Sequence, residues 1–250
     1  MFPSSTPELR RRLREAAAEE LEQLIESSAA ELDGAAIRQI FLNPFLDGGT
    51  IERLLATPAV RLVHAARREA AMHPRTPRAL ALQLVAGLYW RELVAIGVDT
   101  RLHPVVRRSA DTRLVERLAG MSVGERTAVA RRAGPGVMAA VRFDPTPRVI
   151  AALLDNPRLT EGLLLPLAAH ERAHPEVLAT IARDPRWGSR LQLRRALCLN
   201  PATPVAVALT LLPTLDKRSL GAVTAAARVA SPVRRRAALL AGAQLPQRGV

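Results

Sequence analysis

The 250-residue sequence has the length of one large domain or two ordinary ones, and its apolar content of 48% is enough for a continuous core. Aromatic residues make up only 3% of the chain, so we expect a core of leucine, valine, alanine and isoleucine. The single cysteine, Cys198, excludes a disulfide within the chain and is expected to be a small buried residue.

The formal charge of +13 arises from 36 basic and 23 acidic residues. A surplus of this size attracts polyanions non-specifically. Only Lys217 is a lysine, however, and genome base composition alone can produce such an excess of arginine. No apolar run is long enough to span a membrane, and charged residues occupy the place of a signal sequence, so we expect a cytoplasmic protein.

The first predicted element is one amphipathic helix within residues 1–34. Thr6 is expected to cap this helix, Pro7 suits its first position, and apolar residues follow at spacings of three and four. Basic residues precede acidic ones along its polar face, against the helix dipole, so this face is expected to find partners outside the helix. We favour a terminal cap for a repeat array over a helix that docks a partner.

Downstream, proline repeatedly follows a polar residue, as at Asn43, His73 and Asn200. Each such pair predicts the end of one short helix and the start of the next, because proline disfavours helical geometry in the residue before it. About fourteen helices and no strands are expected, in segments such as 58–71, 104–119, 122–133 and 204–212. The predicted fold class is all-α, an α-solenoid of stacked short helix pairs over residues 35–242, with a tail at 243–250.

An internal duplication supports this architecture. A shift of 127 positions places the HPRTP segment at 73–77 on the NPATP segment at 200–204, and the leucines that follow coincide. Self-similarity over about forty residues predicts two related halves, at about 35–120 and 135–242. Leu209 and Leu211 are predicted core positions.

The segment 194–212 reads arginine, a small apolar residue, Asn-Pro-x-Thr-Pro and a leucine-rich helix. This pattern resembles the leucine-rich repeat variant, a bacterial repeat of alternating short helices, and more broadly the HEAT and armadillo repeats. Clear matches cover about a third of the chain. The resemblance implies a non-enzymatic scaffold whose concave face binds another macromolecule. The iron–sulfur cluster of some variant-repeat proteins is not expected, because one cysteine cannot hold it.

The candidate binding edge consists of arginine pairs at repeat positions that the duplication makes equivalent. These residues are Arg67, Arg68, Arg107, Arg108, Arg194, Arg195, Arg235 and Arg236. The match of Arg107 and Arg108 with Arg235 and Arg236 assumes one inserted residue, which aligns Pro104 with Pro232. A ladder of guanidinium groups suits phosphate or carboxylate binding, whereas arginines near helix ends also bond carbonyls structurally. The sequence leaves both roles open.

A protein is the partner that we favour, and a nucleic acid contacted through the arginine pairs is the alternative. No membrane, small-molecule substrate or cofactor is expected. The third hypothesis is a helical-repeat DNA glycosylase with Trp90 or Trp187 beside Asp99, Asp184 or Asp216. We expect Trp90 at the end of an apolar helix and Trp187 at a repeat junction. Both positions favour packing roles over a role in a glycosylase site.

The string at residues 170–174 spells the HExxH motif of zinc peptidases. Pro175 follows directly, and we expect it to push His174 out of the helix into a capping position. No catalytic or metal-binding residue is predicted.

Overall fold

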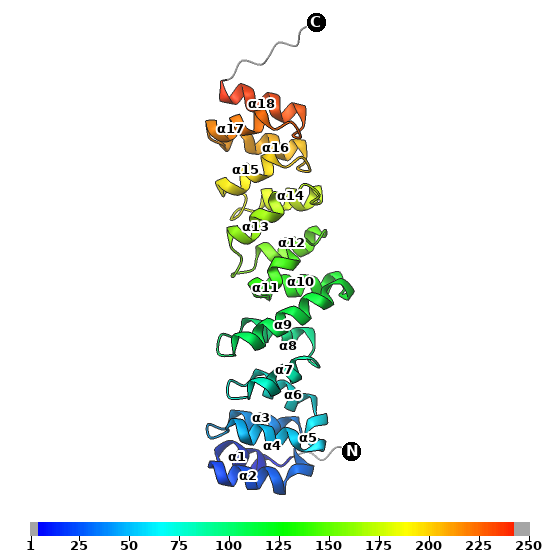
Figure 1. Ribbon diagram of the computed structural model, residues 1–250, viewed down its shortest axis with the longest axis vertical. Helices are drawn as coiled ribbons and strands as arrows, with labels where there is room; N and C mark the ends of the chain where they lie inside the picture. The colour runs from blue at the N-terminus through cyan, green and yellow to red at the C-terminus, as the bar shows by residue number, and fades with distance from the viewer. Residues whose placement is uncertain (1–4, 243–250) are drawn as a thin grey trace. The chain divides into compact units, whose positions relative to one another are not determined.

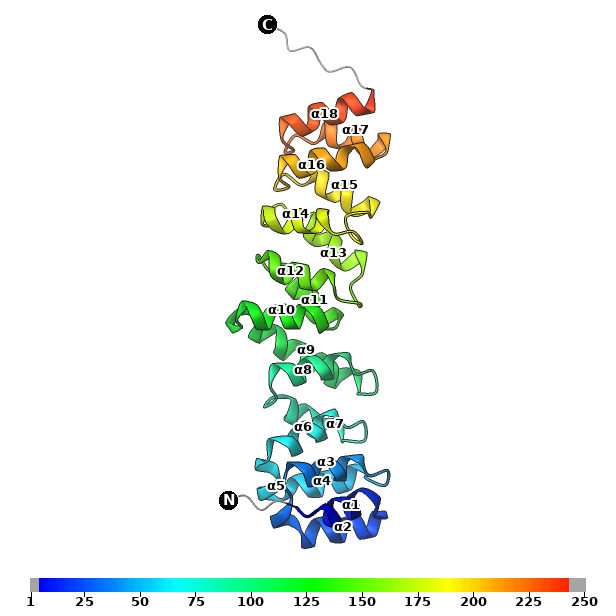
Figure 2. The same cartoon turned by 180° about the vertical axis from the view of Figure 1, so that it is seen from behind.

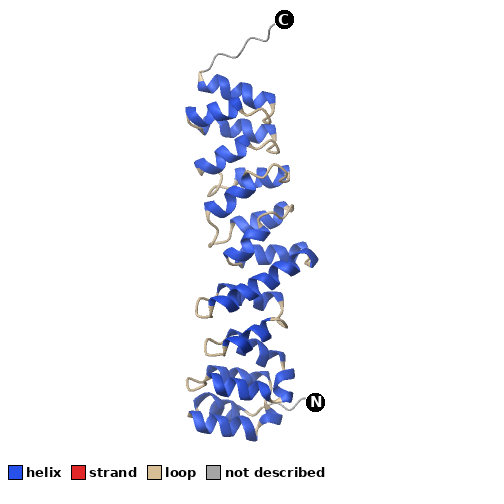
Figure 3. Cartoon of the chain, in the orientation of Figure 1, coloured by secondary structure: helices blue, strands red, loops and turns tan. Residues whose placement is uncertain are grey.

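The computed structural model describes residues 5–242, and the chain divides into two compact units, residues 1–116 and 117–250 (Figure 1). All regular structure in the described residues is helical, which confirms the predicted all-α class (Figure 3). The tail expected at 243–250 lies outside the described residues. Every described helix is too short or too polar to reach across a lipid bilayer.

The first unit contains the helices α1 (Pro7–Glu15), α2 (Ala18–Ser27), η1 (Ala29–Glu31), α3 (Gly34–Leu42), α4 (Gly48–Ala56), α5 (Pro58–Leu62), α6 (His64–Met72), α7 (Arg78–Val85), α8 (Trp90–Val98) and all of α9 (Pro104–Arg117) except its last residue, Arg117, which belongs to the second unit. The second unit contains η2 (Leu118–Gly120), α10 (Val123–Arg132), α11 (Pro135–Val141), α12 (Pro147–Leu154), α13 (Glu161–Ala168), α14 (Pro175–Arg183), α15 (Leu191–Leu199), α16 (Val205–Leu211), η3 (Leu212–Thr214), α17 (Lys217–Ala225) and α18 (Ser231–Ala241).

The prediction of one helix within residues 1–34 is wrong. Two helices, α1 and α2, meet at Ala16 and Ala17, whose ψ angles of 141° and 165° are extended. The start was predicted correctly, because Thr6 Oγ1 accepts a hydrogen bond from the Leu9 N–H at 3.2 Å. The break is stabilised from outside, since the Asn43 amide donates to the Ala16 carbonyl at 2.9 Å.

The polar face of this segment finds most of its partners within residues 1–34, contrary to the expectation. Arg11 pairs with Glu8 and Glu15, and Arg12 pairs with Glu20. Glu22 does reach outside the segment, to Arg53 of α4. The segment predicted at 58–71 is also two helices, α5 and α6, separated by the extended Val63. The described residues contain eighteen α-helices, above the fourteen expected, and these two breaks account for two of the additional four.

Within the second unit the helices form two layers. One layer runs α11, α13, α15 and α17, and the other runs α10, α12, α14, α16 and α18, each helix packing on the next of its own series. Opposite views show the two series as separate columns (Figures 1 and 2). In the first unit α1, α3, α6 and α8 form a comparable series. Helices of one series are thus separated in sequence by a helix of the other.

The 127-residue shift relates the helices of the two units beyond the segment where the sequences match. It carries α4, α6 and α8 onto the bounds of α14, α15 and α17. It carries α1, α2, α3 and α7 to within two residues of the bounds of α11, α12, α13 and α16. The short helices α5 and η1 meet non-helical segments, at 185–189 and 156–158. The two units therefore share most of their helix bounds.

The inserted residue assumed before the last arginine pairs is wrong. Helix α9 begins at Pro104 and α18 begins at Ser231, so the shift stays at 127. Pro232 is the second residue of α18, and proline fits at either position of a first turn because those N–H groups have no helical acceptor. Arg107 and Arg108 therefore correspond to Arg234 and Arg235.

Two predictions about the core of the second unit can be checked directly. Leu211 is buried, whereas Leu209 is only half-buried. Cys198 is buried as expected, with its Sγ 3.8 Å from the Ala208 carbonyl oxygen. Burial raises the pKa of the Cys198 thiol to about 12, so this group is inert as a nucleophile.

Candidate binding surfaces

Buried asparagines join successive helices of one layer. Asn43, Asn156 and Asn200 each direct the side-chain amide at two carbonyls of an earlier helix end. For Asn200 the acceptors are Ala168 and His170, at 2.8 and 3.0 Å. The Asn200 side-chain oxygen accepts the N–H of Ala202 at 2.9 Å. These contacts satisfy carbonyls that a helix end leaves without partners, so the Asn-Pro motif is a structural junction.

Trp187 forms a junction of a different kind. Its side chain is buried, and Nε1 donates to the Leu154 carbonyl at 3.0 Å. The predicted packing role at a repeat junction is confirmed. Trp90 is the first residue of α8, with Arg91 stacked 5.1 Å from its ring, so its predicted place at the end of a helix is wrong.

The aspartates considered for a glycosylase site are all engaged in local structure. Asp99 pairs with Arg101 at 2.7 Å, and the hydrogen bonds from the Arg101 side chain lower the Asp99 pKa. Asp184 accepts the N–H groups of Arg186 and Trp187. Asp216 caps α17, and the N–H of Ser219 lowers the Asp216 pKa. Each of the three carboxylates is therefore occupied by a contact within its own helix end or turn.

The HExxH string at 170–174 lies in a turn and not on a helix. His174 caps α14, its Nδ1 accepting the N–H of Glu176 at 3.3 Å, as the following Pro175 predicted. Glu171 pairs with Arg228 at 2.5 Å. In the part of the chain that the structure describes, no three His, Cys, Asp or Glu side chains gather into a metal-binding group.

The first arginine of each pair is partly built into the fold. Arg194 Nε donates to the Gly188 carbonyl at 2.7 Å. The Nε atoms of Arg67, Arg107 and Arg234 are buried without a hydrogen-bond partner. Arg67 also lines a groove of about 530 Å³ with residues of α4, α5 and α7. Aliphatic stems held in this way stabilise packing and restrict the guanidinium groups.

The second arginine of each pair is freer. Arg108 and Arg235 are exposed, whereas Arg68 pairs with its neighbour Glu69 at 3.3 Å. Arg195 forms no ion pair. In the second unit the two pairs lie on α15 and α18, which belong to different layers. The arginines predicted to form one edge therefore fall into two groups, one with restrained side chains and one with freer side chains. They also lie on two layers.

The two units differ in formal charge, and the arginine pairs alone do not reveal this difference. Residues 1–116 contain 16 basic and 15 acidic residues, a net charge of +1. Residues 117–250 contain 20 basic and 8 acidic residues, a net charge of +12. The surplus of the whole chain therefore belongs almost entirely to the second unit. Counting charges on the two sides of residue 116 finds this difference, but the boundary is known only from the structure.

Few acidic partners are available to the arginines of the second unit. Its described ion pairs are Arg126–Asp144, Arg131–Asp155 and Arg228–Glu171. The described arginines of this unit whose side chains form no ion pair and no hydrogen bond include Arg132, Arg148, Arg158, Arg172, Arg183, Arg190, Arg195, Arg218, Arg235 and Arg236. Their charge is available to a partner.

A groove between α13 and α15 brings one of these arginines beside an apolar floor. Its volume is about 290 Å³, and its lining includes Leu165, Ala169, Ala196 and Leu199 with Arg195 beside them. Gln192, Glu171, Asn200 and Pro201 complete the wall. Sequence reasoning singled out Arg195 but not the floor, because the floor requires α13 and α15 to be neighbours.

Comparison with known proteins gives no match to a family model, a curated protein or a solved structure. Function must therefore be argued from the surfaces of the two units.

Proposed function

We propose that the chain is a non-enzymatic helical-repeat scaffold that binds another protein through its second unit. The two-layer packing of that unit supports a repeat architecture of the HEAT, armadillo or leucine-rich variant kind, and the proposal extends it to an α-solenoid. Stacked helices of this kind display extended surfaces instead of an enclosed pocket. The buried asparagine junctions supply the structural reason for the repeated Asn-Pro motif.

The charge difference between the units carries the proposal. The first unit balances its arginines with its own acids, for example in the Arg12–Glu20 and Arg53–Glu22 pairs. The second unit leaves most of its arginines unpaired, with exposed Leu191, Val205 and Leu239 among them. A protein surface that combines acidic and apolar groups complements such a mixture, since charge speeds encounter and apolar contact adds affinity.

A nucleic acid is the second candidate, and the charge of +12 on the second unit is the observation that favours it. Phosphates would be contacted through the unpaired arginines. Base stacking would contribute little to nucleic-acid affinity, because aromatic residues are 3% of the chain and Trp187 is buried.

Fluorescence anisotropy separates the two candidates. The intact chain is titrated against labelled polyglutamate, double-stranded DNA and single-stranded RNA at about 50 and about 200 mM salt. The proposal predicts that polyglutamate binds at the lower salt concentration and that the nucleic acids bind no more tightly. Tight nucleic-acid binding that falls by about a thousandfold or more across this range would support the second candidate. Failure to bind any of these probes would contradict both.

A further inference from the structure

We propose that the groove between α13 and α15 binds an acidic segment of a partner protein, whose apolar side chains enter the groove while its carboxylates meet Arg195. This inference rests on the proposed function and names the partner's chemistry. The floor supplies apolar contact through Leu165, Ala169 and Leu199. Desolvated carboxylates pair well with a guanidinium group, which offers two parallel donors.

The charges around the groove leave Arg195 uncompensated. Glu171 is the only acid in the lining, and both of its oxygens accept hydrogen bonds from Arg228, at 2.5 and 2.6 Å. Asp216 lies close enough for Arg195 to help lower its pKa, but it caps α17 and forms no ion pair with Arg195. Arg218 adds further positive charge near Asp216. An acidic segment therefore finds free cations here, whereas a basic one is repelled.

The corresponding surface of the first unit replaces part of the apolar floor with charged residues. The 127-residue shift places Arg38 at the position of Leu165 and Glu69 at the position of Ala196. There the equivalent arginine, Arg68, is paired with Glu69 at 3.3 Å. The same helices pack in both units. Leu165 and Ala196 thus distinguish the groove from its counterpart without serving the helical framework.

The size of the groove also favours a segment over a small molecule. A volume of about 290 Å³ lies just below the range of about 300–1,000 Å³ typical of small-molecule pockets. It accepts a few side chains of a longer chain. The exposed Leu191 and Gln192 extend the surface along α15, toward the amino end of that helix.

The test uses the intact chain and a fluorescein-labelled amphipathic peptide of glutamate and leucine, with a lysine–leucine peptide as the charge-reversed probe. Ala196→Glu installs the residue of the first unit, which should pair with Arg195 as Glu69 pairs with Arg68. Arg195→Gln removes the cation. We expect each variant to weaken binding of the acidic peptide by about tenfold or more, with no binding of the lysine peptide.

Matched variants in the first unit serve as controls. Glu69→Ala and Arg68→Gln alter the equivalent positions and should leave the affinity unchanged, and thermal melts verify that all four proteins fold. Unchanged affinity in Ala196→Glu, with the acidic peptide still bound, would overturn the groove while leaving the proposed function intact. No binding of the acidic peptide or of polyglutamate by the unaltered chain would overturn both. Binding of DNA but not peptide, weakened by the same substitutions, would overturn a protein partner.

Discussion

The first and second units share helix bounds at a constant shift of 127 positions, yet they carry formal charges of +1 and +12. Equivalent helices need the same buried residues and the same satisfied carbonyls, so the framework limits what can change. Surface positions carry no such restriction. The difference between the units therefore lies at surface positions, and it is the basis for placing the proposed binding surface on the second unit.

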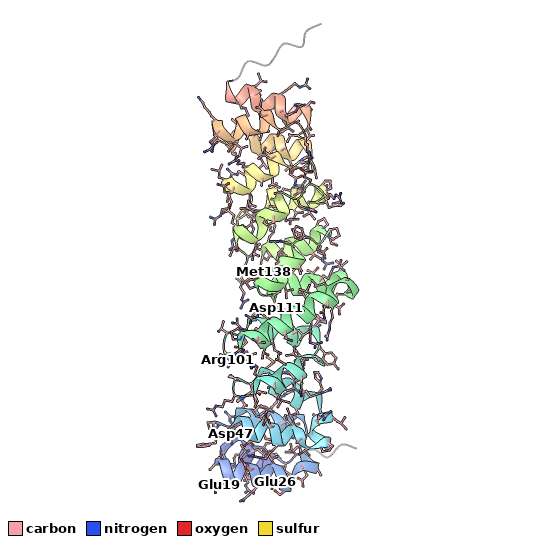
Figure 4. All side chains as sticks on the ribbon, viewed as in Figure 1. Glu19, Glu26, Asp47, Arg101, Asp111 and Met138 are labelled. Atoms are coloured by element: carbon pink, nitrogen blue, oxygen red, sulfur yellow. The ribbon has the colours of Figure 1, made fainter. Side chains whose placement is uncertain are left out.

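The two units differ in a side-chain pair between α8 and α9. Asp111 of α9 is labelled in Figure 4. Its carboxylate lies so close to Gly97 of α8 that a Cβ added there would clash with it. The shift replaces this pair with Ala238 and Thr224, exchanging the larger and the smaller side chain. The larger side chain of the pair therefore belongs to α9 in the first unit and to α17 in the second.

The largest expected effect comes from removing a core leucine that both units have. Leu93 of α8 and Leu220 of α17 are equivalent and buried. Leu93→Ala and Leu220→Ala should each cost about 2–5 kcal/mol, through lost burial and the cavity left behind. Urea unfolding of each variant measures this cost. If one variant alone left the free energy of unfolding nearly unchanged, this would contradict the structural equivalence of α8 and α17.

A smaller effect is expected at the junctions. Asn200→Ala leaves the Ala168 and His170 carbonyls without their donor and should cost about 1–3 kcal/mol. His73 holds the equivalent position but accepts only the local Arg75 N–H, at 3.3 Å. His73→Ala should therefore cost less in the same urea experiment. Equal losses would show that the junction does not depend on the asparagine amide.

The smallest effect concerns pH. Burial raises the Asp111 pKa to about 6 from its ordinary value of 3.8, against the opposing effect of Arg107. The ionised carboxylate therefore destabilises the folded state above about pH 6, and this loss disappears as pH falls to about 4. Asp111→Ala, the residue of the second unit, should raise the melting temperature at pH 8 more than at pH 4. Equal changes at both pH values would contradict the raised pKa of the half-buried Asp111 carboxylate.

Several features of the fold were predictable because local chemistry determines them. Proline after a polar residue correctly indicated helix ends at Asn43, His73 and Asn200. The break at Ala16–Ala17 was not predictable from local preference, since alanine favours helix and the break depends on Asn43 from a distant segment. The alignment of Pro104 with Pro232 misplaced the last arginine pair, because the first turn of a helix accepts proline at either of two positions.

The candidate site was predictable only in part. Arg195 was identified from repetition, but equal spacing could not separate it from Arg194, whose Nε is bonded to the Gly188 carbonyl. That distinction depends on the side of α15 from which each side chain projects. The floor around Leu165 is visible only when the shift is extended to α3 and α13, where the sequences no longer match but the helices still do.

The most direct test of a binding surface confined to the second unit compares equivalent arginines. Arg195 and Arg218 correspond to Arg68 and Arg91. The affinity of the intact chain for the acidic glutamate–leucine peptide is measured in Arg195→Gln/Arg218→Gln and in Arg68→Gln/Arg91→Gln across a salt series. We predict that the first double variant loses about tenfold or more in affinity and shows a weaker salt dependence, while the second binds as the unaltered chain does. Equal losses in both would contradict the account.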